Sequence, residues 1–550
     1  MLGANAIVQI LQKEGIEQIF CFPTTPILEA CAEEGLRPIV ARQERVAENM
    51  ADGFSRATCG ERIGVVTVQQ SAGAENGFAG IAQARTDSSP ILFLPGHPGT
   101  EWVGVPPTFD SVPNYRAITK WADMIPSAGT IPGRMRRAFT CLRTGRPGPV
   151  LVEVPVDVAS AEFPGPLQYN PIAPARSGGD PTAIRDAARL LLAARCPMIW
   201  AGQGVLYARA SSELTEVAEL LAAPVMTTLL GKSGFNERHP LSLGTGAYSQ
   251  TEMVTDYLKR SDVILGIGAS LTRSLFAPEI DTNHCAIVHA TNDARDLNKD
   301  YQPEVTILGD AKLVLEQLRE EIRGQTGDKD RPERSEVEAH VGNVRAAWRQ
   351  RWAPKLTSNE SPINPYRVMG DFMKLVDPAD AIVTHDSGNP RDQLVPIYES
   401  VTPRGYIGWG HSTQLGFSLG VAMGAKLAQP DKLVVNFLGD TAIGMVGMDI
   451  ETAAREQIPI LTLLLNNGAM GNYHHLIPKA VERYGTKYLT GNYSEVARGL
   501  GAHSERIDKP EEVTPALKRG ITATREGKPA LIEFMTCEEP DFNVVRGGSH

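Results

Sequence analysis

The chain is 550 residues long, and at about 150 residues per domain this length predicts three or four domains. Its formal net charge of −10 and the lack of a long basic run argue against a nucleic-acid partner, and no apolar run approaches the roughly 18 to 20 residues of a membrane span. The first residues lack the basic, apolar and cleavage regions of a signal peptide, so we expect a cytoplasmic location.

The first predicted domain covers residues 1–165. Helical and strand patterns alternate along it, over residues 4–14, 18–22, 41–57, 63–69 and 90–94. This alternation is typical of a parallel α/β domain. Residues 162–181 are rich in proline and glycine, which indicates an extended linker and a domain boundary.

The central domain is predicted over residues 182–325. Its expected elements include a helix over 183–194, a strand over 197–201 and a helix over 211–221. Gly266 and Gly268 follow a further strand but make only half of a dinucleotide-binding fingerprint, so a structural turn is favoured. Polar segments and a predicted helix over 336–352 then lead into a last domain over 363–550.

A short β-branched run over 433–438 opens the most informative stretch of the last domain. Gly439 and Asp440 close this predicted buried strand in a turn, a helix is expected over 447–457, and a second strand over 458–465 ends at Asn467. One strand–helix–strand unit therefore brings Asp440 and Asn467 to the same edge of a parallel sheet. One carboxylate, one amide oxygen and a loop carbonyl suit magnesium when phosphate and water complete the shell, whereas the bland alternative is a structural turn.

Two stretches resemble one enzyme family. GDTAIGMVGMDIETAAREQIPILTLLLNN, from Gly439 to Asn467, resembles the thiamine diphosphate signature. ARQERVAENMADGFSRATCG, from Ala41 to Gly60, resembles the pyrimidine-domain segment of the acetolactate synthase and 2-oxo acid decarboxylase branch, which includes benzoylformate decarboxylase. The resemblance implies three parallel-sheet α/β domains. The first (1–165) binds the pyrimidine, the second (182–325) resembles a nucleotide fold, and the third (363–550) binds diphosphate and magnesium.

The resemblance also implies thiamine diphosphate and Mg²⁺ as cofactors, with roles for individual residues. Glu44 matches the catalytic glutamate that exchanges a proton with the aminopyrimidine ring, and burial would raise the pKa of such a carboxyl. Asp440, Asn467 and the backbone oxygen of Ala469 match the metal ligands. Leu415 matches the apolar wedge that folds the cofactor. The full set of implied cofactor contacts is Gly388, Asn389, His411, Leu415, Gly439, Thr441, Ala442 and Gly471.

By resemblance, four stretches face the substrate: 22–25, 69–70, 97–98 and 473–476. Each departs from an ordinary acetolactate synthase, which argues against acetolactate synthesis itself. The departures are Thr24 and Thr25 in place of glycines, His97 in place of glutamine, Asp110 in place of glutamine and Leu476 in place of tryptophan. We expect one or two of His97, His411, His474 and His475 to transfer protons, because histidine titrates near neutrality.

The leading hypothesis is a thiamine diphosphate- and magnesium-dependent lyase or carboligase. It would decarboxylate a 2-oxo acid and then protonate the remaining fragment or add it to a second carbonyl. One alternative is a 2-hydroxyacyl-CoA lyase or synthase, and another is a non-catalytic subunit that only binds cofactor. By analogy with relatives we expect a homodimer or homotetramer with active sites between subunits. FAD is unlikely, because residues 270–274 depart from the flavin-contacting stretch of relatives.

Overall fold

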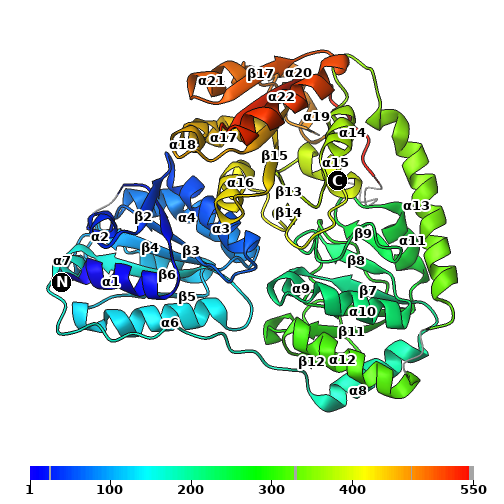
Figure 1. The fold of residues 1–550 in the computed structure, drawn as a ribbon, viewed down its shortest axis with the longest axis horizontal. Helices are drawn as coiled ribbons and strands as arrows, with labels where there is room; N and C mark the ends of the chain where they lie inside the picture. Colours follow the sequence, from blue (N-terminus) through cyan, green and yellow to red (C-terminus); the bar gives the residue numbers. More distant parts are fainter. Residues whose placement is uncertain (24–25, 328–330, 472, 544–550) are drawn as a thin grey trace.

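The computed structural model describes residues 1–23, 26–327, 331–471 and 473–543. Within these ranges the chain forms three six-stranded sheets, one after another along the sequence, and the strands of each sheet pair in parallel. Helices flank each sheet (Figure 1). The predicted fold class, three α/β units with parallel sheets, is confirmed.

The first sheet has the strand order β2-β1-β3-β4-β6-β5. Its strands are β1 (Gln18–Cys21), β2 (Arg37–Val40), β3 (Gly64–Val68), β4 (Ile91–His97), β5 (Trp121–Met124) and β6 (Val150–Pro155). The helices are α1 (Gly3–Lys13), α2 (Ile27–Glu34), α3 (Glu44–Ala57), α4 (Ala72–Thr86), α5 (Ser111–Tyr115), α6 (Ile131–Arg143) and α7 (Val156–Ser160). Every residue of β3 is buried, as expected for a strand covered on both faces.

The second sheet has the order β12-β11-β10-β7-β8-β9. Its strands are β7 (Pro197–Ala201), β8 (Val225–Thr228), β9 (Ser242–Gly246), β10 (Val263–Ile267), β11 (Ala286–Thr291) and β12 (Val305–Leu308). The helices are α8 (Pro181–Ala193), α9 (Gln203–Tyr207), α10 (Ser211–Leu221), α11 (Glu252–Arg260) and α12 (Ala311–Thr326). The helix α13 (Arg334–Leu356) then runs along the outside of the molecule to the third sheet (Figure 1).

The third sheet has the order β14-β13-β15-β16-β18-β17. Its strands are β13 (Ala381–His385), β14 (Tyr406–Ile407), β15 (Leu433–Gly439), β16 (Leu461–Asn466), β17 (His503–Ile507) and β18 (Ala530–Met535). The helices are α14 (Pro365–Leu375), α15 (Asn389–Ile397), α16 (Phe417–Ala428), α17 (Asp440–Val446), α18 (Ile450–Arg455), α19 (Tyr473–Leu476), α20 (Pro478–Tyr484), α21 (Tyr493–Gly499) and α22 (Val513–Arg525).

The segment after β15 differs from the sequence prediction. A helix, α17, begins directly at Asp440 where we predicted only a turn, and the helix predicted over 447–457 is reduced to a 3₁₀ turn (Gly447–Asp449) and the short α18. Gly444 and Gly447 weaken the helical pattern in the sequence, because glycine is a poor helix former. Burial of Ala442, Ile443 and Val446 in the core stabilises the helix instead.

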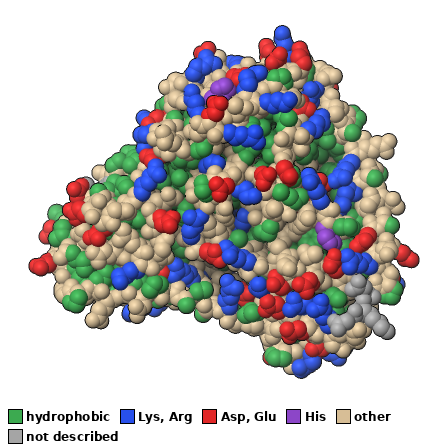
Figure 2. All heavy atoms as spheres, in the orientation of Figure 1, with side chains coloured by type: hydrophobic (Ala, Val, Ile, Leu, Met, Phe, Trp, Pro, Cys, Tyr) green, Lys and Arg blue, Asp and Glu red, His purple; other side chains and the backbone are tan. Residues whose placement is uncertain are grey.

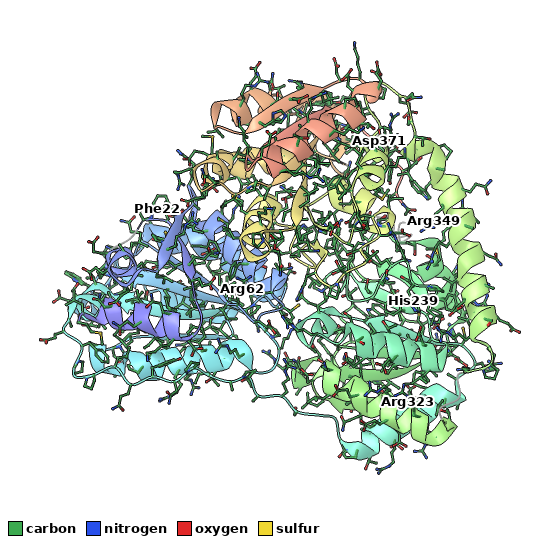
Figure 3. The ribbon with its side chains drawn as sticks, in the orientation of Figure 1. Phe22, Arg62, His239, Arg323, Arg349 and Asp371 are labelled. Carbon is green, nitrogen blue, oxygen red and sulfur yellow. The ribbon has the colours of Figure 1, made fainter. Side chains whose placement is uncertain are left out.

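The first and third sheets are joined by the packing of α3 against α16, which lie side by side in Figure 1. Glycines allow the two backbones to touch: a Cβ added at Gly53 would lie 2.2 Å from the carbonyl oxygen of Val421, and one at Gly424 would lie 1.9 Å from that of Met50. The side chain of Arg62 also crosses this boundary and donates a hydrogen bond to the carbonyl of Ala428 (Figure 3).

On the surface, Lys and Arg side chains are interspersed with Asp and Glu side chains over the face seen in Figure 2. In the part of the chain that the structure describes, no helix is both long enough and apolar enough to cross a membrane.

Candidate active site

Asp440 lies where β15 ends and α17 begins. Because β15 and β16 pair in parallel, the loop after β16 comes to the same edge of the sheet. The Asp440 side chain is buried, and its Oδ1 accepts a hydrogen bond from the N–H of Thr441 at 2.7 Å. Its Oδ2 has no hydrogen-bond partner of normal geometry among the described residues. Burial raises the pKa of Asp440, and the N–H groups of Thr441, Gly468 and Ala469 oppose this. Asp440 and this loop are therefore neighbours.

The loop after β16 is held by its two asparagines. Asn466 accepts a hydrogen bond from the N–H of Gly468 at 3.0 Å, and Asn467 accepts one from the N–H of Ala469 at 3.0 Å. The amide nitrogen of Asn466 donates to Glu533 at 2.7 Å, which fixes the orientation of that side chain. The loop thus presents amide and carbonyl oxygens beside a buried carboxylate.

The segment after β13 reaches the same edge. Gly388 has φ 82°, a conformation that favours glycine, and Asn389 begins α15. A Cβ added at Gly471 would lie 2.7 Å from Oδ1 of Asn389, so these two predicted cofactor contacts are adjacent. Gly439 lies against Pro390, since a Cβ added there would lie 3.6 Å from the proline ring. Four predicted cofactor residues therefore gather at one sheet edge.

Asp386 lies in the 385–389 loop that resembles the diphosphate-contacting loop of the family, although it was not among the predicted site residues, and it ties this segment to the start of α16. It is buried and accepts hydrogen bonds from the N–H groups of Gly416 and Ser418, both at 3.0 Å, and from the Ser418 hydroxyl at 2.7 Å. Burial raises the pKa of Asp386, and these donors oppose the rise. The predicted wedge, Leu415, directly precedes this anchor and is half-buried. The adjacency of Asp386 to Gly388 at a strand end is the sequence signal that could have identified it.

Glu44 is the first residue of α3, and its buried carboxylate accepts a hydrogen bond from Asn76 at 3.4 Å. The start of α3 contacts the last turn of α17 and the 3₁₀ turn that follows it in the same chain. Gln43 donates to the carbonyl of Met445 at 3.1 Å, and Asp449 accepts a hydrogen bond from the N–H of Arg42 at 2.7 Å. Glu44 thus lies at the boundary between the first and third sheets.

His97 and Asp110, two of the departures noted in the sequence, contact each other. Nε2 of His97 lies 2.9 Å from Oδ1 of Asp110, and Nδ1 accepts the N–H of Gly99 at 3.3 Å. Because Nδ1 is an acceptor, Nε2 carries the proton and donates it. A Cβ added at the neighbouring Gly96 would lie 3.3 Å from the backbone nitrogen of Gln70, so the predicted pocket stretches 69–70 and 97–98 are adjacent.

The other predicted histidines have different surroundings. His474 and His475 lie on the exposed α19 with ring centroids 3.7 Å apart, and the following Leu476 is also exposed. The backbone N–H of His411 donates to Oδ1 of Asp87 at 3.3 Å, and burial lowers the pKa of the His411 imidazole. The structure thus brings His97 near Gln70 but leaves His474 and His475 on the surface of the single chain. Thr24 and Thr25 lie outside the described residues.

Comparison with known proteins explains this arrangement. Three family models match: "Thiamine pyrophosphate enzyme, N-terminal TPP binding domain" over residues 1–118, the central domain over 184–318 and the C-terminal TPP binding domain over 386–534. A probable acetolactate synthase large subunit of Methanocaldococcus jannaschii is 30% identical over 561 residues, which cover 97% of this chain and 92% of that protein. The chain belongs to the thiamine diphosphate-dependent enzymes.

Further relatives place this thiamine diphosphate enzyme in the acetolactate synthase family. A probable acetolactate synthase large subunit of Methanococcus aeolicus is 29% identical over 580 residues, covering 100% of this chain and 94% of that protein. The acetolactate synthase isozyme 3 large subunit of Escherichia coli K12 is 28% identical over 575 residues, covering 99% of this chain and 97% of that protein. The similarity therefore extends over the whole length.

The residues at the sheet edge are compatible with the cofactor of a thiamine diphosphate enzyme. A buried carboxylate oxygen without a partner, at Asp440, is costly unless a cation or donor pairs with it. Oxygen donors of the 467–469 loop are the ligand type that magnesium prefers. Among the described residues no cluster of three or more His, Cys, Asp or Glu side chains could hold a metal by itself, so a cation here would also need the phosphate oxygens of the cofactor. Of the other predicted contacts, Thr441 is half-buried and Ala442 is buried in the apolar core.

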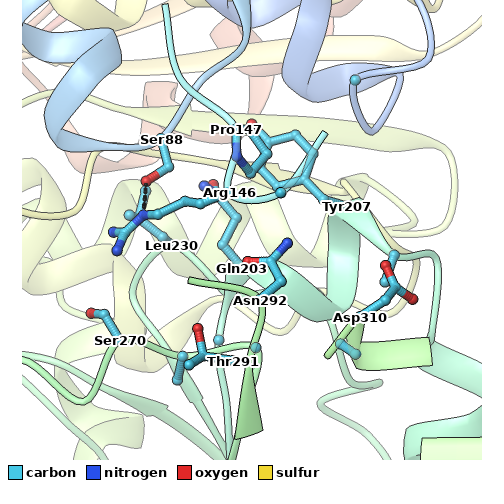
Figure 4. A pocket seen from close by; sticks show the side chains of 18 of the residues that line it. Ser88, Arg146, Pro147, Gln203, Tyr207, Leu230, Ser270, Thr291, Asn292 and Asp310 are labelled. Atoms are coloured by element: carbon cyan, nitrogen blue, oxygen red, sulfur yellow. Dashed lines mark hydrogen bonds between the residues drawn. The ribbon is translucent and has the colours of Figure 1, made fainter. Parts of the chain in front are cut away.

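A second feature of this thiamine diphosphate enzyme is a cavity of about 660 Å³ between the three sheets (Figure 4). Arg146 reaches into it from the first domain, donates to the Ser88 hydroxyl at 2.8 Å and pairs with both carboxylate oxygens of Asp296 at 2.9 Å. The Gly268 turn lines the cavity, has φ 58° and touches α9, whose Gly204 N–H donates to its carbonyl at 2.8 Å. His411 also lines the cavity. Sequence reasoning did not predict this cavity, because its walls come from distant segments.

Proposed function

We propose that the chain is a thiamine diphosphate- and Mg²⁺-dependent enzyme that decarboxylates a 2-oxo acid and joins the remaining fragment to a second carbonyl, as an acetolactate synthase-like carboligase. The observation that carries this proposal is the buried, unpartnered Oδ2 of Asp440 beside the Asn467 loop. The family match and the relatives named acetolactate synthase support it. Protonation of the fragment to an aldehyde is the simpler outcome of the same chemistry.

In this proposal, Asp440, Asn467 and the carbonyl of Ala469 hold the magnesium ion. Gly388, Asn389, Gly439, Thr441, Ala442 and Gly471 line the diphosphate, and small residues there leave backbone N–H groups accessible to phosphate oxygens. When bound, thiamine diphosphate supplies a nucleophilic carbon and an electron sink for cleavage of a carbon–carbon bond. The half-buried Leu415 would pack against the cofactor as its apolar wedge.

Glu44 holds the proton that activates the cofactor in this proposal. Its carboxyl group would hold and release a proton beside the aminopyrimidine ring of a bound cofactor, and its position at the buried start of α3 limits the access of water. His97 is oriented by Asp110, whose carboxylate accepts a hydrogen bond from Nε2 of His97. We propose that this pair replaces a neutral amide contact at the substrate end of the pocket and alters substrate choice relative to acetolactate synthase.

We also propose a homodimer or homotetramer in which sites form between subunits. Exposed apolar side chains support this proposal, because large exposed apolar areas mark interaction surfaces. Tyr473, Leu476, Ile477, Tyr484 and Tyr488 in and around α19 and α20 are 40%, 58%, 39%, 74% and 59% exposed. In such an assembly His474 and His475 would face a neighbouring subunit. Light scattering with size-exclusion chromatography tests this, and a monomeric active enzyme would contradict it.

The cavity between the three sheets favours one further candidate, an enzyme acting on 2-hydroxyacyl-CoA. Its volume of about 660 Å³, its glycine turns and the arginine at its wall suit an adenine nucleotide portion of a ligand. We propose that FAD does not occupy this cavity. Titration with CoA, ADP and FAD, followed by calorimetry, distinguishes these ligands: tight CoA or ADP binding supports this candidate, and tight FAD binding contradicts our expectation.

The experiment that tests the proposed function supplies thiamine diphosphate, Mg²⁺ and a panel of 2-oxo acids, with and without aldehyde or CoA-ester partners. Mass spectrometry follows carbon dioxide and the organic products. Carbon dioxide release with a hydroxyketone or a branched 2-hydroxy-3-oxo acid supports carboligation, and release with an aldehyde supports decarboxylation. Turnover of an acyl-CoA alone favours the second candidate. Cofactor binding without any turnover identifies a non-catalytic subunit and refutes the proposal.

A further inference from the structure

A second glutamate lies one helical turn after Glu44. Residues four apart on a helix share a face, so Glu48 and Glu44 both point from α3 toward α4. Asn76 of α4 contacts Glu44, and Gly77 and Gly80 follow Asn76 on the same helix. A Cβ added at Gly77 would lie 2.2 Å from Oε1 of Glu48, and one at Gly80 would lie 2.1 Å from Oε2. The two glycines of α4 therefore make the space that this carboxyl group fills.

Glu48 is fully buried, and neither of its oxygens has a hydrogen-bond partner of normal geometry in the described part of the chain. The titratable groups nearest to it are Glu44 and Arg45 on its own helix and Tyr115 on α5. The Tyr115 hydroxyl donates to the carbonyl of Ala74. The Arg45 guanidinium extends toward the third sheet, where a Cβ added at Gly416 would lie 3.3 Å from Nη2. Toward Glu48, α4 presents Asn76 and the glycines Gly77 and Gly80, and none of these side chains titrates.

An ionised carboxylate in this position would be desolvated without compensation, and a second charge at Glu44 would repel it. Burial therefore raises the pKa of Glu48 well above its ordinary value, Glu44 adds to the rise, and the backbone N–H groups of α4 and Arg45 oppose it only in part. Glu48 is the more deeply buried of the two side chains, and burial favours its protonated form.

We propose that Glu48 is a positioning residue for Glu44: its carboxyl group, enclosed by the glycines of α4 one helical turn away, sets the charge beside Glu44 and so the pH range over which Glu44 can act. The proposal rests on the role proposed above for Glu44. It assigns a function to the glycines of α4 as well, because a larger residue at Gly77 or Gly80 would displace the Glu48 carboxyl. Sequence reasoning did not single out Glu48, since an isolated glutamate on a helix is usually solvated.

The first test is the pH profile of kcat/KM for the holoenzyme, wild type and Glu48→Gln, from about pH 5 to about pH 10. Glutamine keeps the shape of a neutral carboxyl group but cannot ionise. We expect the transition at high pH to disappear or move by at least about one unit, with a change in maximal kcat below about threefold. Glu75→Gln, on the exposed face of α4, is the matched control and should leave the profile unchanged. An equal loss at every pH with unmoved transitions indicates a merely structural role and overturns the proposal.

The second test does not depend on turnover. Because the pKa of Glu48 is higher in the folded than in the unfolded protein, its contribution to stability is present below about pH 4.3 and is lost as pH rises. Urea unfolding of the cofactor-free protein should therefore show Glu48→Gln gaining stability relative to wild type with rising pH. Parallel pH dependences overturn a neutral Glu48. If Glu48→Gln does not fold, infrared spectra of the wild type at neutral pH decide. A protonated-carboxyl band supports the proposal, and the absence of such a band overturns it.

Glu44→Gln measured in parallel separates this inference from the proposed function. Full activity of Glu44→Gln would remove Glu44 from catalysis and refute the proposed role, whatever the unfolding experiment shows. Loss of activity in Glu44→Gln together with an unchanged pH profile in Glu48→Gln would leave the proposed function intact and reject only the positioning role of Glu48.

Discussion

Replacing Asp440 with asparagine should separate cofactor binding from folding. In the protein without cofactor, the buried Oδ2 of Asp440 has no hydrogen-bond partner of normal geometry among the described residues. A buried charged group left unsatisfied costs more than a neutral polar group in the same place. Asparagine is nearly isosteric, keeps an acceptor for the Thr441 N–H and removes the charge. We therefore expect the free energy of unfolding of cofactor-free D440N to rise by about 1–2 kcal/mol in urea denaturation.

The same substitution should weaken cofactor binding, because the magnesium ion loses the negatively charged ligand that Asp440 would provide. A charge-assisted contact is worth about 2–3 kcal/mol, which corresponds to an increase in Kd of about 30- to 150-fold. Isothermal titration of thiamine diphosphate at saturating Mg²⁺ measures this change. Folded D440N that binds the cofactor as tightly as wild type would refute the metal site.

Asp371→Asn is the matched control, because Asp371, which is labelled in Figure 3, is also buried but has hydrogen-bond partners. Arg367 lies 2.8 Å, Lys374 3.2 Å and Thr514 2.8 Å from its carboxylate oxygens. D371N should lower the free energy of unfolding, since it removes two ion pairs, and should leave the Kd of the cofactor unchanged. The two variants thus change stability in opposite directions.

Three further predictions concern activity, pH and packing. Glu44→Gln should lower kcat about 10²- to 10⁴-fold with little change in cofactor Kd, and steady-state kinetics beside calorimetry would show near wild-type turnover if Glu44 were not the proton carrier. Burial raises the pKa of Asp449 to about 6, so the contribution of Asp449 to stability is complete below about pH 3.8 and is lost as pH rises through about 6. D449N should therefore gain stability relative to wild type across that pH range. Urea unfolding curves whose difference stays constant with pH would contradict this prediction. Gly424→Ala places a Cβ 1.9 Å from the Met50 carbonyl oxygen and should destabilise the protein by about 3 kcal/mol, whereas Gly342→Ala, with open space around it, should not; equal midpoints for both would refute close α3–α16 packing.

The sequence alone was sufficient for the features that depend on neighbouring residues. Alternating apolar and helical patterns predicted parallel α/β units, and α10 and β7 have the predicted bounds. Parallel pairing of β15 with β16 follows from two buried strands joined by a helical segment, which is why Asp440 and Asn467 could be placed at one edge before the structure was known. The individual site roles stay predictions.

The tertiary structure alone decided which distant segments meet. The contact of His97 with Asp110 depends on how residues 98–110 fold back, and the sequence showed only two separate departures from the family. The start of α17 at Asp440 depends on core packing that outweighs weak helix propensity. Glu48 is buried because glycines of α4, about 30 positions away in the chain, leave room for it. Local patterns determine elements, whereas burial and charge depend on contacts between elements that no local pattern records.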